Sequence, residues 1–309
     1  MPELDRRTFL AVSGLAFVGL ATSCGGDDEP SPTGGTIESL ISQAEAERAT
    51  RIQVIQANLQ VLVRSDARVP FALISSEGAR SSGGSPRAWY GQAGTRARGP
   101  VEVSYHGEGL GEKGVYVGRF NFDQAGQWQV FVTANDGGRK LYGEATFEAV
   151  QRVSGPAPGA KAIAVPTPTV DDHRGVEPYC TRVDSKGEAS PCSMHRISLD
   201  VALANGKPTV LNIGTPKFCT SRVCGPVVDV IQTVGAELAD RVNFVHVEVY
   251  KDDKADTVQR QLLAPAAAAW GLSEEPITYW IKPDGTITER VVGPIDVPEV
   301  RDLTNALLS

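Results

Sequence analysis

The sequence predicts a two-domain protein, in which an antiparallel β-sandwich is followed by an α/β domain. Three observations support this prediction. The length of 309 residues is sufficient for two domains with separate cores. Apolar and polar residues alternate between residues 46 and 152, which is typical of half-buried strands. Beyond residue 166, strand-like apolar runs alternate with helix-like segments, as expected for a sheet covered by helices.

Composition is that of an ordinary globular protein and excludes some partners. Hydrophobic residues make up 41% and charged residues 22% of the chain. A formal net charge of -7 argues against nucleic acid as a partner. No internal run approaches the roughly 18 consecutive apolar residues of a transmembrane helix.

Residues 1–24 have the pattern of an export signal. Arg6 and Arg7 precede Phe9 and Leu10, and the apolar stretch that follows, residues 11–21, is too short to span a bilayer. The Arg-Arg-x-Phe-Leu order resembles a twin-arginine signal, which implies export of an already folded protein.

Cys24 ends the apolar stretch in the sequence LATSC, which resembles a bacterial lipoprotein box. The resemblance implies that Cys24 is acylated and anchors the protein to the bacterial cell membrane. Ala21 departs from the pattern, which has leucine there, and ordinary cleavage nearby is the alternative. Either route leads to an extracytoplasmic compartment, where disulfides persist. Residues 25–45 are expected to form a flexible tether, since the segment to about Gly35 is polar and rich in Gly and Pro, and a short helix is the alternative for residues 37–50.

Residues 46–152 are expected to form the β-sandwich. Two alternating runs within residues 127–149 are joined through Asn135-Asp136-Gly137-Gly138, which is a strong hairpin signal. Several short strands with Gly-rich connections predict an immunoglobulin-like sandwich, without the cysteine pair of antibody domains. No function is indicated here, and we expect a spacer or a partner-docking module.

Residues 153–165 are rich in Pro and Gly and are expected to link the β-sandwich to a second domain at 166–309.

Near the start of the second domain, Cys180 and Cys192 flank a polar loop. Their simplest pairing is a structural disulfide, worth about 3 kcal/mol in the chain-entropy model, although four cysteines allow three pairings. Cys192-Ser-Met194-His195 also offers ligands that copper(I) prefers, but adjacent residues converge on one ion only in a special loop.

The remaining elements follow a recognisable order. We expect strands at 209–213, 242–249, 277–281 and 286–292. A short helix is expected at 199–204, and a second helix follows the loop that holds Cys219 and Cys224 and ends near residue 239. Two more are expected, one at 255–270 with a kink or break at Pro265 and one from Asp296 to the C-terminus. His246, within the second strand, is expected to pack in the sheet rather than to bind metal. From the strand at 209–213 onward, the order β-α-β-α-β-β-α is that of a thioredoxin fold.

The segment Glu275-Pro276-Ile-Thr-Tyr-Trp-Ile-Lys-Pro-Asp-Gly resembles extracytoplasmic thioredoxin-like proteins. In that family a cis-proline opens the strand and lies beside a redox-active cysteine pair. The resemblance therefore implies that Pro276 is cis and adjacent to Cys219 and Cys224, where it would position the substrate backbone.

The spacing of Cys219 and Cys224 limits where the helix can begin. On one intact helix they would be separated by about 7.5 Å along the axis, whereas a disulfide needs Cα atoms within about 7 Å. Pro226 is confined to the first helical turn, so the helix begins between Arg222 and Pro226. Cys219 then lies in the preceding loop, and the two cysteines can bond.

Either cysteine could be the nucleophile. Cys224-Gly-Pro-Val resembles the Cys-Gly-Pro-Cys of thioredoxin, which implies attack by Cys224. The Cys-x4-Cys loop also resembles Q-type peroxiredoxins, which implies attack by Cys219 and resolution by Cys224. That family has a proline and a hydroxyl residue where this chain has Asn212 and Pro216. Arg222 has two interpretations: its positive charge would favour either thiolate, or it is a solvated loop arginine.

The main hypothesis is a membrane-tethered, extracytoplasmic thiol–disulfide oxidoreductase that acts on protein thiols or disulfides or on a redox donor. The alternatives are a thiol peroxidase, and a copper-binding or redox-inactive module of thioredoxin fold. Under the main hypothesis we expect no cofactor and no metal.

Overall fold

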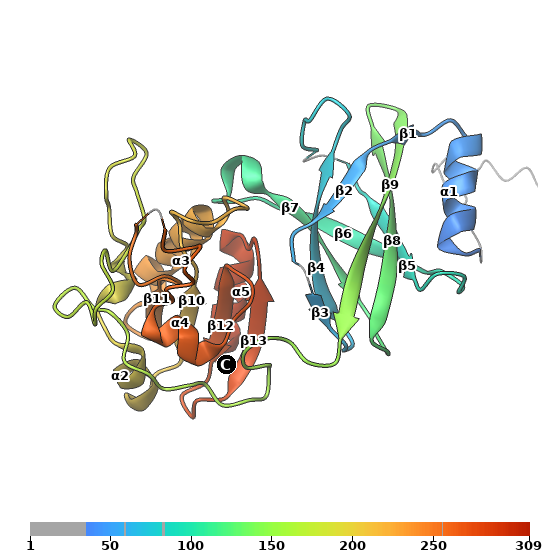
Figure 1. Cartoon of the computed structure of the whole chain (residues 1–309). Coiled ribbons are helices and arrows are strands. Elements are labelled where there is room, and N and C mark those ends of the chain that lie inside the picture. The colour runs from blue at the N-terminus through green and yellow to red at the C-terminus, as the bar shows by residue number, and fades with distance from the viewer. Residues whose placement is uncertain (1–34, 59, 82–83, 255) are drawn as a thin grey trace, which may run out of the picture. The chain divides into compact units, whose positions relative to one another are not determined.

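The computed structural model describes residues 35–58, 60–81, 84–254 and 256–309 (Figure 1). The expected export signal, with Arg6, Arg7 and Cys24, lies outside the described residues. Within them, no helix combines the length and apolar character needed to cross a bilayer.

The first described element is a helix rather than a tether. Helix α1 (Ile37–Ala46) begins at Thr36, whose side chain accepts a hydrogen bond from the Ser39 amide. Its buried side chains pack in one cluster with aromatic residues of the β-domain, including Trp89 and Phe131. The short helix that was the alternative for residues 37–50 is therefore present, and the tether expected at 25–45 does not extend over residues 37–45.

The N-terminal domain is built from nine strands. They are β1 (Thr50–Arg51), β2 (Gln53–Gln56), β3 (Gln60–Leu62), β4 (Ala67–Ile74), β5 (Arg87–Gly91), β6 (Arg98–His106), β7 (Val115–Phe120), β8 (Gly126–Asp136) and β9 (Arg139–Val150), with a 3-10 turn η1 (Gly111–Lys113) before β7. The predicted hairpin is confirmed as β8–β9, which turns at Gly137 and Gly138, both with positive φ.

These strands form one mixed sheet in the order β1-β9-β8-β5-β6-β7-β4-β2, with β3 also paired to β9. The sheet nearly closes on itself. β1 pairs in parallel with β9 at one end, whereas β2, which follows at once, pairs with β4 at the other. The amide of Ile52, between β1 and β2, donates to the carbonyl oxygen of Tyr142 at 2.8 Å.

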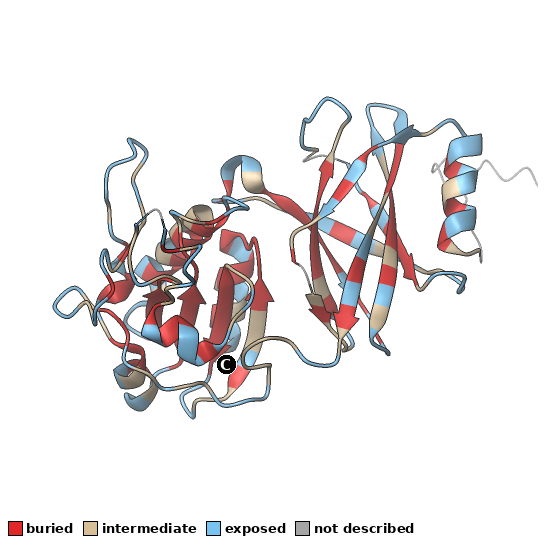
Figure 2. Cartoon of the chain, viewed as in Figure 1, coloured by how far each residue is buried: buried red, intermediate tan, exposed pale blue. Residues whose placement is uncertain are grey.

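The expected immunoglobulin-like sandwich is thus replaced by a near-barrel. Alternation in the sequence fixes one buried face for each strand, but a curled sheet and two packed sheets share that pattern. The buried faces enclose an aromatic core (Figure 2). Its large side chains include Phe71, Tyr90, Tyr116, Phe120 and Trp128.

The C-terminal domain has a four-stranded sheet in the order β11-β10-β12-β13. Its elements are η2 (Ser193–His195), α2 (Leu199–Ala204), β10 (Thr209–Ile213), α3 (Cys224–Leu238), β11 (Asn243–Val247), α4 (Pro265–Trp270), β12 (Ile277–Ile281), β13 (Ile287–Val292) and α5 (Val297–Ala306). β10 pairs in parallel with β11 and antiparallel with β12, and β12 pairs antiparallel with β13. The expected thioredoxin-like order of elements is therefore present.

Each face of this sheet has its own core. Val210 of β10 packs in one cluster with residues of α3 and α5, whereas Leu211 and Ile213 pack in another with residues of α2 and α4. This division follows from the period of two along a strand. The uninterrupted apolar runs of the sequence belong to strands buried on both faces.

The structure shows how the chain is arranged at two segments, the helix expected at 255–270 and the linker expected at 153–165. Pro265 begins α4 instead of kinking a longer helix, because proline is tolerated at the first helical position. The described residues between 256 and 264 form turns and irregular structure. The Pro/Gly segment at 153–165 contacts the second domain, since the amides of Gly159 and Ala162 donate to the carbonyls of Ile287 and Gly285 at 2.8 Å.

Closure of the near-barrel depends on a glycine in β9. A Cβ atom at Gly143 would lie 2.5 Å from the Ile52 carbonyl oxygen and 2.9 Å from Val54 Cγ2. We expect Gly143→Ala to lower the free energy of unfolding by about 1–3 kcal/mol, because backbone of the closing segment must move. Thr146→Ala, an exposed change in the same strand, should alter it by about 0.5 kcal/mol or less. Urea unfolding of the full chain measures both, and equal effects would contradict this role for Gly143.

Candidate active site

The site forms where β10 ends and the chain leaves the sheet at Gly214. Its amide donates to the Val247 carbonyl at 3.1 Å, which holds the strand end beside β11. A Cβ atom there would lie 3.2 Å from Pro276 Cβ and 3.7 Å from Cys224 Cβ. Glycine at this position lets the cysteine loop and the proline approach each other closely.

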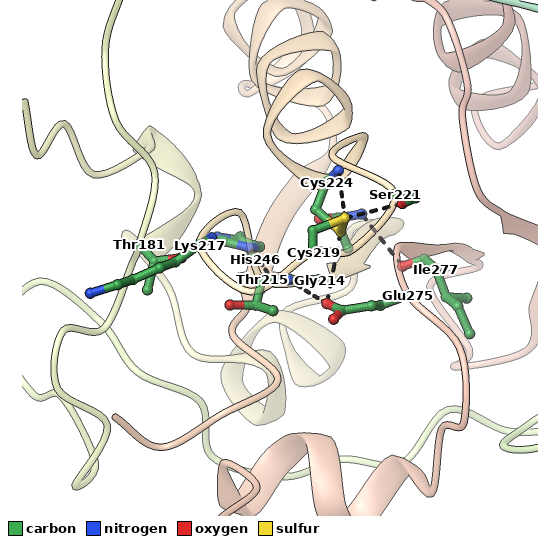
Figure 3. The surroundings of a disulfide bond; sticks show 11 residues. Thr181, Gly214, Thr215, Lys217, Cys219, Ser221, Cys224, His246, Glu275 and Ile277 are labelled. Atoms are coloured by element: carbon green, nitrogen blue, oxygen red, sulfur yellow. Dashed lines mark hydrogen bonds between the residues drawn. A yellow bond between two sulfur atoms is a disulfide. The ribbon is translucent and has the colours of Figure 1, made fainter. Parts of the chain in front are cut away.

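Cys219 and Cys224 form a disulfide with Cα atoms 6.0 Å apart (Figure 3). Cys224 is the first residue of α3, and Cys219 lies in the loop before it. The prediction that the helix begins between Arg222 and Pro226 is confirmed. Pro226 occupies the first turn, where its missing N–H costs nothing.

The two sulfur atoms lie in different environments. Cys224 is fully buried, whereas 7% of the surface of Cys219 is accessible. The amide of Cys224 at the helix N-terminus points at Cys219 Sγ, 3.3 Å away, and Ser221 Oγ lies 3.2 Å from the same sulfur. An N–H group at a helix start favours negative charge, so a thiolate is stabilised best at Cys219.

Pro276 follows a cis peptide bond and lies beside the cysteine pair, as the resemblance implied. The residue before it, Glu275, was not singled out from the sequence. Its carboxylate accepts a hydrogen bond from the Thr215 amide at 2.7 Å and lies 3.8 Å from Cys224 Sγ (Figure 3). The sequence does hold a signal for Glu275: it is an acidic residue directly before the proline that is expected beside the cysteines.

Glu275 is positioned to exchange a proton near neutral pH. Burial raises its pKa to about 7, although the hydrogen bond from Thr215 acts in the opposite direction. A carboxyl group with such a pKa is half ionised near neutrality, and it is therefore suited to serve as a general acid or base for the Cys224 sulfur.

Arg222 is placed as the solvated loop residue that was one of its two interpretations. Its side chain is exposed, its backbone has φ of 57°, and its amide donates to the Cys219 carbonyl at 3.1 Å. Within the described part of the chain its guanidinium makes no hydrogen bond or ion pair. Solvent and salt weaken the effect of such a charge on the sulfur atoms.

Cys180 and Cys192 do not form the expected disulfide. Both are free and buried, and their sulfur atoms lie 3.8 and 3.5 Å from Nδ1 of His246. With His195 and His246 they form one of two groups among the described residues that could hold a metal ion, the other being His106, Asp296 and Glu299, and the four donor atoms lie within 4.8 Å of one another. Met194, the thioether of the copper(I) ligand set that the sequence offered, lies in the same buried cluster as Cys180 and Cys192.

Comparison with known proteins gives limited information. No protein-family model matches the chain, and no curated protein matches it either. Among solved structures, it is similar to a thiol:disulfide interchange protein of the thioredoxin family from Chlorobium tepidum TLS, with 18% sequence identity and a TM-score of 0.29. That match covers 52% of this chain and 100% of the other chain. The activity of the site is therefore inferred from its own geometry.

Proposed function

We propose that the protein is a thiol–disulfide oxidoreductase whose redox pair is Cys219 and Cys224. The observation that carries this proposal is a disulfide at the start of α3 with a titratable carboxyl group 3.8 Å from its buried sulfur. A purely structural disulfide does not exchange protons and does not need a titratable carboxyl group beside it. The cis-proline lies beside the pair, close to Gly214 and Cys224.

In the oxidised protein, Cys219 is the sulfur that a partner thiolate attacks, because it is the more accessible of the two. The new bond joins the partner sulfur to Cys219, and the electron pair of the broken bond goes to Cys224. Glu275 in its neutral form donates a proton to the Cys224 thiolate. A second thiol of the partner then displaces Cys219, whose thiolate is held by the Cys224 amide.

The reverse sequence reduces a partner disulfide. The Cys219 thiolate attacks the partner, and a mixed disulfide forms. Ionised Glu275 then removes the proton of the Cys224 thiol, which attacks Cys219 Sγ and releases the reduced partner. Cys219 is thus the attacking residue and Cys224 the resolving one, with Glu275 as acid or base.

The peroxidase alternative has less support. Where a peroxiredoxin-like site would have its proline, Asn212 is buried in β10 and its amide donates to Thr278 Oγ1 at 3.0 Å. Pro216 replaces the hydroxyl residue, and the exposed Arg222 is not held against Cys219. The geometry therefore favours exchange with thiols over reaction with peroxide.

We also propose that the protein acts outside the cytoplasm, anchored through an acylated Cys24. The support is the order Arg6-Arg7-x-Phe-Leu and the cysteine that ends the apolar stretch. Acyl chains on Cys24 would bind this end of the chain to the membrane, because burial of each CH₂ group contributes about 0.8 kcal/mol.

Single cysteine substitutions test the assignment of the pair. We expect Cys219→Ser to abolish reduction of a peptide disulfide, because the attacking thiolate is lost. Cys224→Ser should instead accumulate a mixed disulfide between Cys219 and the peptide, detectable by intact mass spectrometry. Adduct on Cys224 in the Cys219→Ser protein would reverse the assignment, and unchanged turnover in both variants would refute the function.

The pKa of Glu275 predicts a pH profile. We expect the rate of the resolving step to rise with pH through about 7, as the carboxylate forms. Glu275→Gln should remove this inflection and slow the step by about 100-fold or more. Stopped-flow measurement of mixed-disulfide decay between pH 5 and 9 checks both, and an inflection that survives the substitution would contradict the role.

Stability provides an independent measurement on the same variant. The folded pKa of about 7 lies above the value of 4.5 for a glutamate in water, so the neutral carboxyl favours the folded state. This contribution is complete below pH 4.5 and is lost as pH rises through 7. The pH dependence of unfolding in that window should be smaller in Glu275→Gln than in the unchanged protein.

The proposed anchor predicts a change in location. Cys24→Ala should move the protein from the membrane fraction to the soluble extracytoplasmic fraction, whereas Arg6→Lys with Arg7→Lys should retain it in the cytoplasm. Cell fractionation with immunodetection measures both. A Cys24→Ala protein that stays in the membrane fraction would contradict lipidation at this cysteine.

A further inference from the structure

Behind the redox loop lies a second cluster of sulfur and nitrogen donors. Cys180 comes from the irregular segment before α2, Cys192 and His195 flank and end the turn η2, and His246 lies on β11. Cys180 and Cys192 are each 3% exposed, and both histidines are fully buried. Residues far apart in the sequence therefore place two thiols and two imidazoles around one point.

The hydrogen bonds of the imidazoles determine which nitrogen faces that point. His246 Nε2 lies 3.0 Å from the Gly214 carbonyl oxygen, and His195 Nδ1 lies 3.3 Å from the Pro168 carbonyl oxygen. A carbonyl only accepts, so these two nitrogens carry the protons. In the neutral rings, His246 Nδ1 and His195 Nε2 then face each other with lone pairs, 3.2 Å apart.

Two lone pairs at this distance repel each other, so a proton or a metal cation must lie between the nitrogens. A proton can join only two of the four donor atoms, whereas a metal ion can join all four. Metal-binding histidines commonly donate their second N–H to a backbone carbonyl, which fixes the ring and its tautomer. Both His195 and His246 have this outer hydrogen bond.

The distances match a tetrahedral zinc site. With Zn–S near 2.3 Å and Zn–N near 2.05 Å, tetrahedral angles require about 3.6 Å between sulfur and nitrogen and about 3.3 Å between the nitrogens. The two sulfur atoms lie 3.8 and 3.5 Å from His246 Nδ1, and the two nitrogens are 3.2 Å apart. All six separations between donor atoms are within 4.8 Å.

Charge distinguishes between the candidate metals. Two thiolates and two neutral imidazoles carry a charge of −2, which a divalent ion neutralises and copper(I) does not. An uncompensated charge in a fully buried cluster is costly. Two sulfur and two nitrogen ligands with no open position are the set of a closed, structural zinc site.

We propose that Cys180, Cys192, His195 and His246 form a structural zinc site. The ion joins the segment at 166–198, which has little regular structure, to the edge strand β11. A long irregular segment needs stabilising contacts to adopt one conformation, and metal binding contributes free energy to folding. His246 also contacts Gly214, the residue that brings the redox loop to Pro276 (Figure 3).

The first experiment measures metal in the unmodified full-length protein. We expect elemental analysis of reduced protein exposed to equimolar zinc, copper and iron salts, then desalted, to find about one zinc per chain. Replacement by cobalt(II) should give the visible spectrum of a tetrahedral ion with thiolate-to-cobalt charge transfer. Metal-free protein with a Cys180–Cys192 disulfide, or copper retained in place of zinc, would overturn the proposal.

The chain supplies its own matched control, because it has two cysteine pairs. Cys180→Ser with Cys192→Ser should lower bound zinc to below about 0.1 per chain, whereas Cys219→Ser with Cys224→Ser should leave it at one. His246→Asn should weaken zinc affinity by at least about 10-fold in competition with a chelator. Zinc that follows the Cys219/Cys224 pair instead would overturn the assignment.

The zinc proposal can be tested even if the variants that lack zinc ligands do not fold. If the Cys180/Cys192 variant fails to fold, chelator treatment of the unmodified protein should lower its melting temperature, and added zinc should restore it in a 1:1 titration. No change in melting temperature on zinc removal would contradict a structural role. Metal content is measured without disulfide exchange, so this proposal and the proposed activity can fail independently.

Discussion

The end of β10 is the constraint on which the C-terminal domain depends. At Gly214 the backbone donates to β11, accepts from His246 Nε2, and passes within contact distance of Pro276 and Cys224. A side chain would separate these groups, because its Cβ atom would already lie 3.2 Å from the proline. The redox pair on one side and the four-ligand cluster on the other therefore share one short piece of backbone.

The two cysteine pairs show that environment decides the chemistry of a thiol. Cys219 and Cys224 lie at a helix start, where an amide stabilises a thiolate and a carboxyl group can exchange a proton. Cys180 and Cys192 lie in the core beside two imidazoles, and Cys192 precedes only the short 3-10 turn η2. The first environment suits electron transfer between thiols, and the second suits a metal ion.

Predictions from the sequence succeeded where local signals were strong. The strand at 209–213, the helix start fixed by Pro226 and the hairpin at Gly137 and Gly138 depend on alternation, proline sterics and positive φ, which are all local. The near-barrel was not predictable, since closure depends on which distant strand the segment at 50–56 meets. The break at Pro265 could be read either as a kink or as a start, and tertiary contacts decided between them.

By itself the sequence determined the order of elements in the C-terminal domain and the separation of Cys219 from the helix, whereas the proline beside the pair was expected from a family resemblance. Only the tertiary structure decided which sulfur is accessible, because burial of Cys224 depends on packing by Gly214 and Pro276. It also brought Glu275 to the sulfur and gathered His195 and His246 around the other cysteines. Those contacts join residues up to 66 positions apart, and no local pattern records such distances.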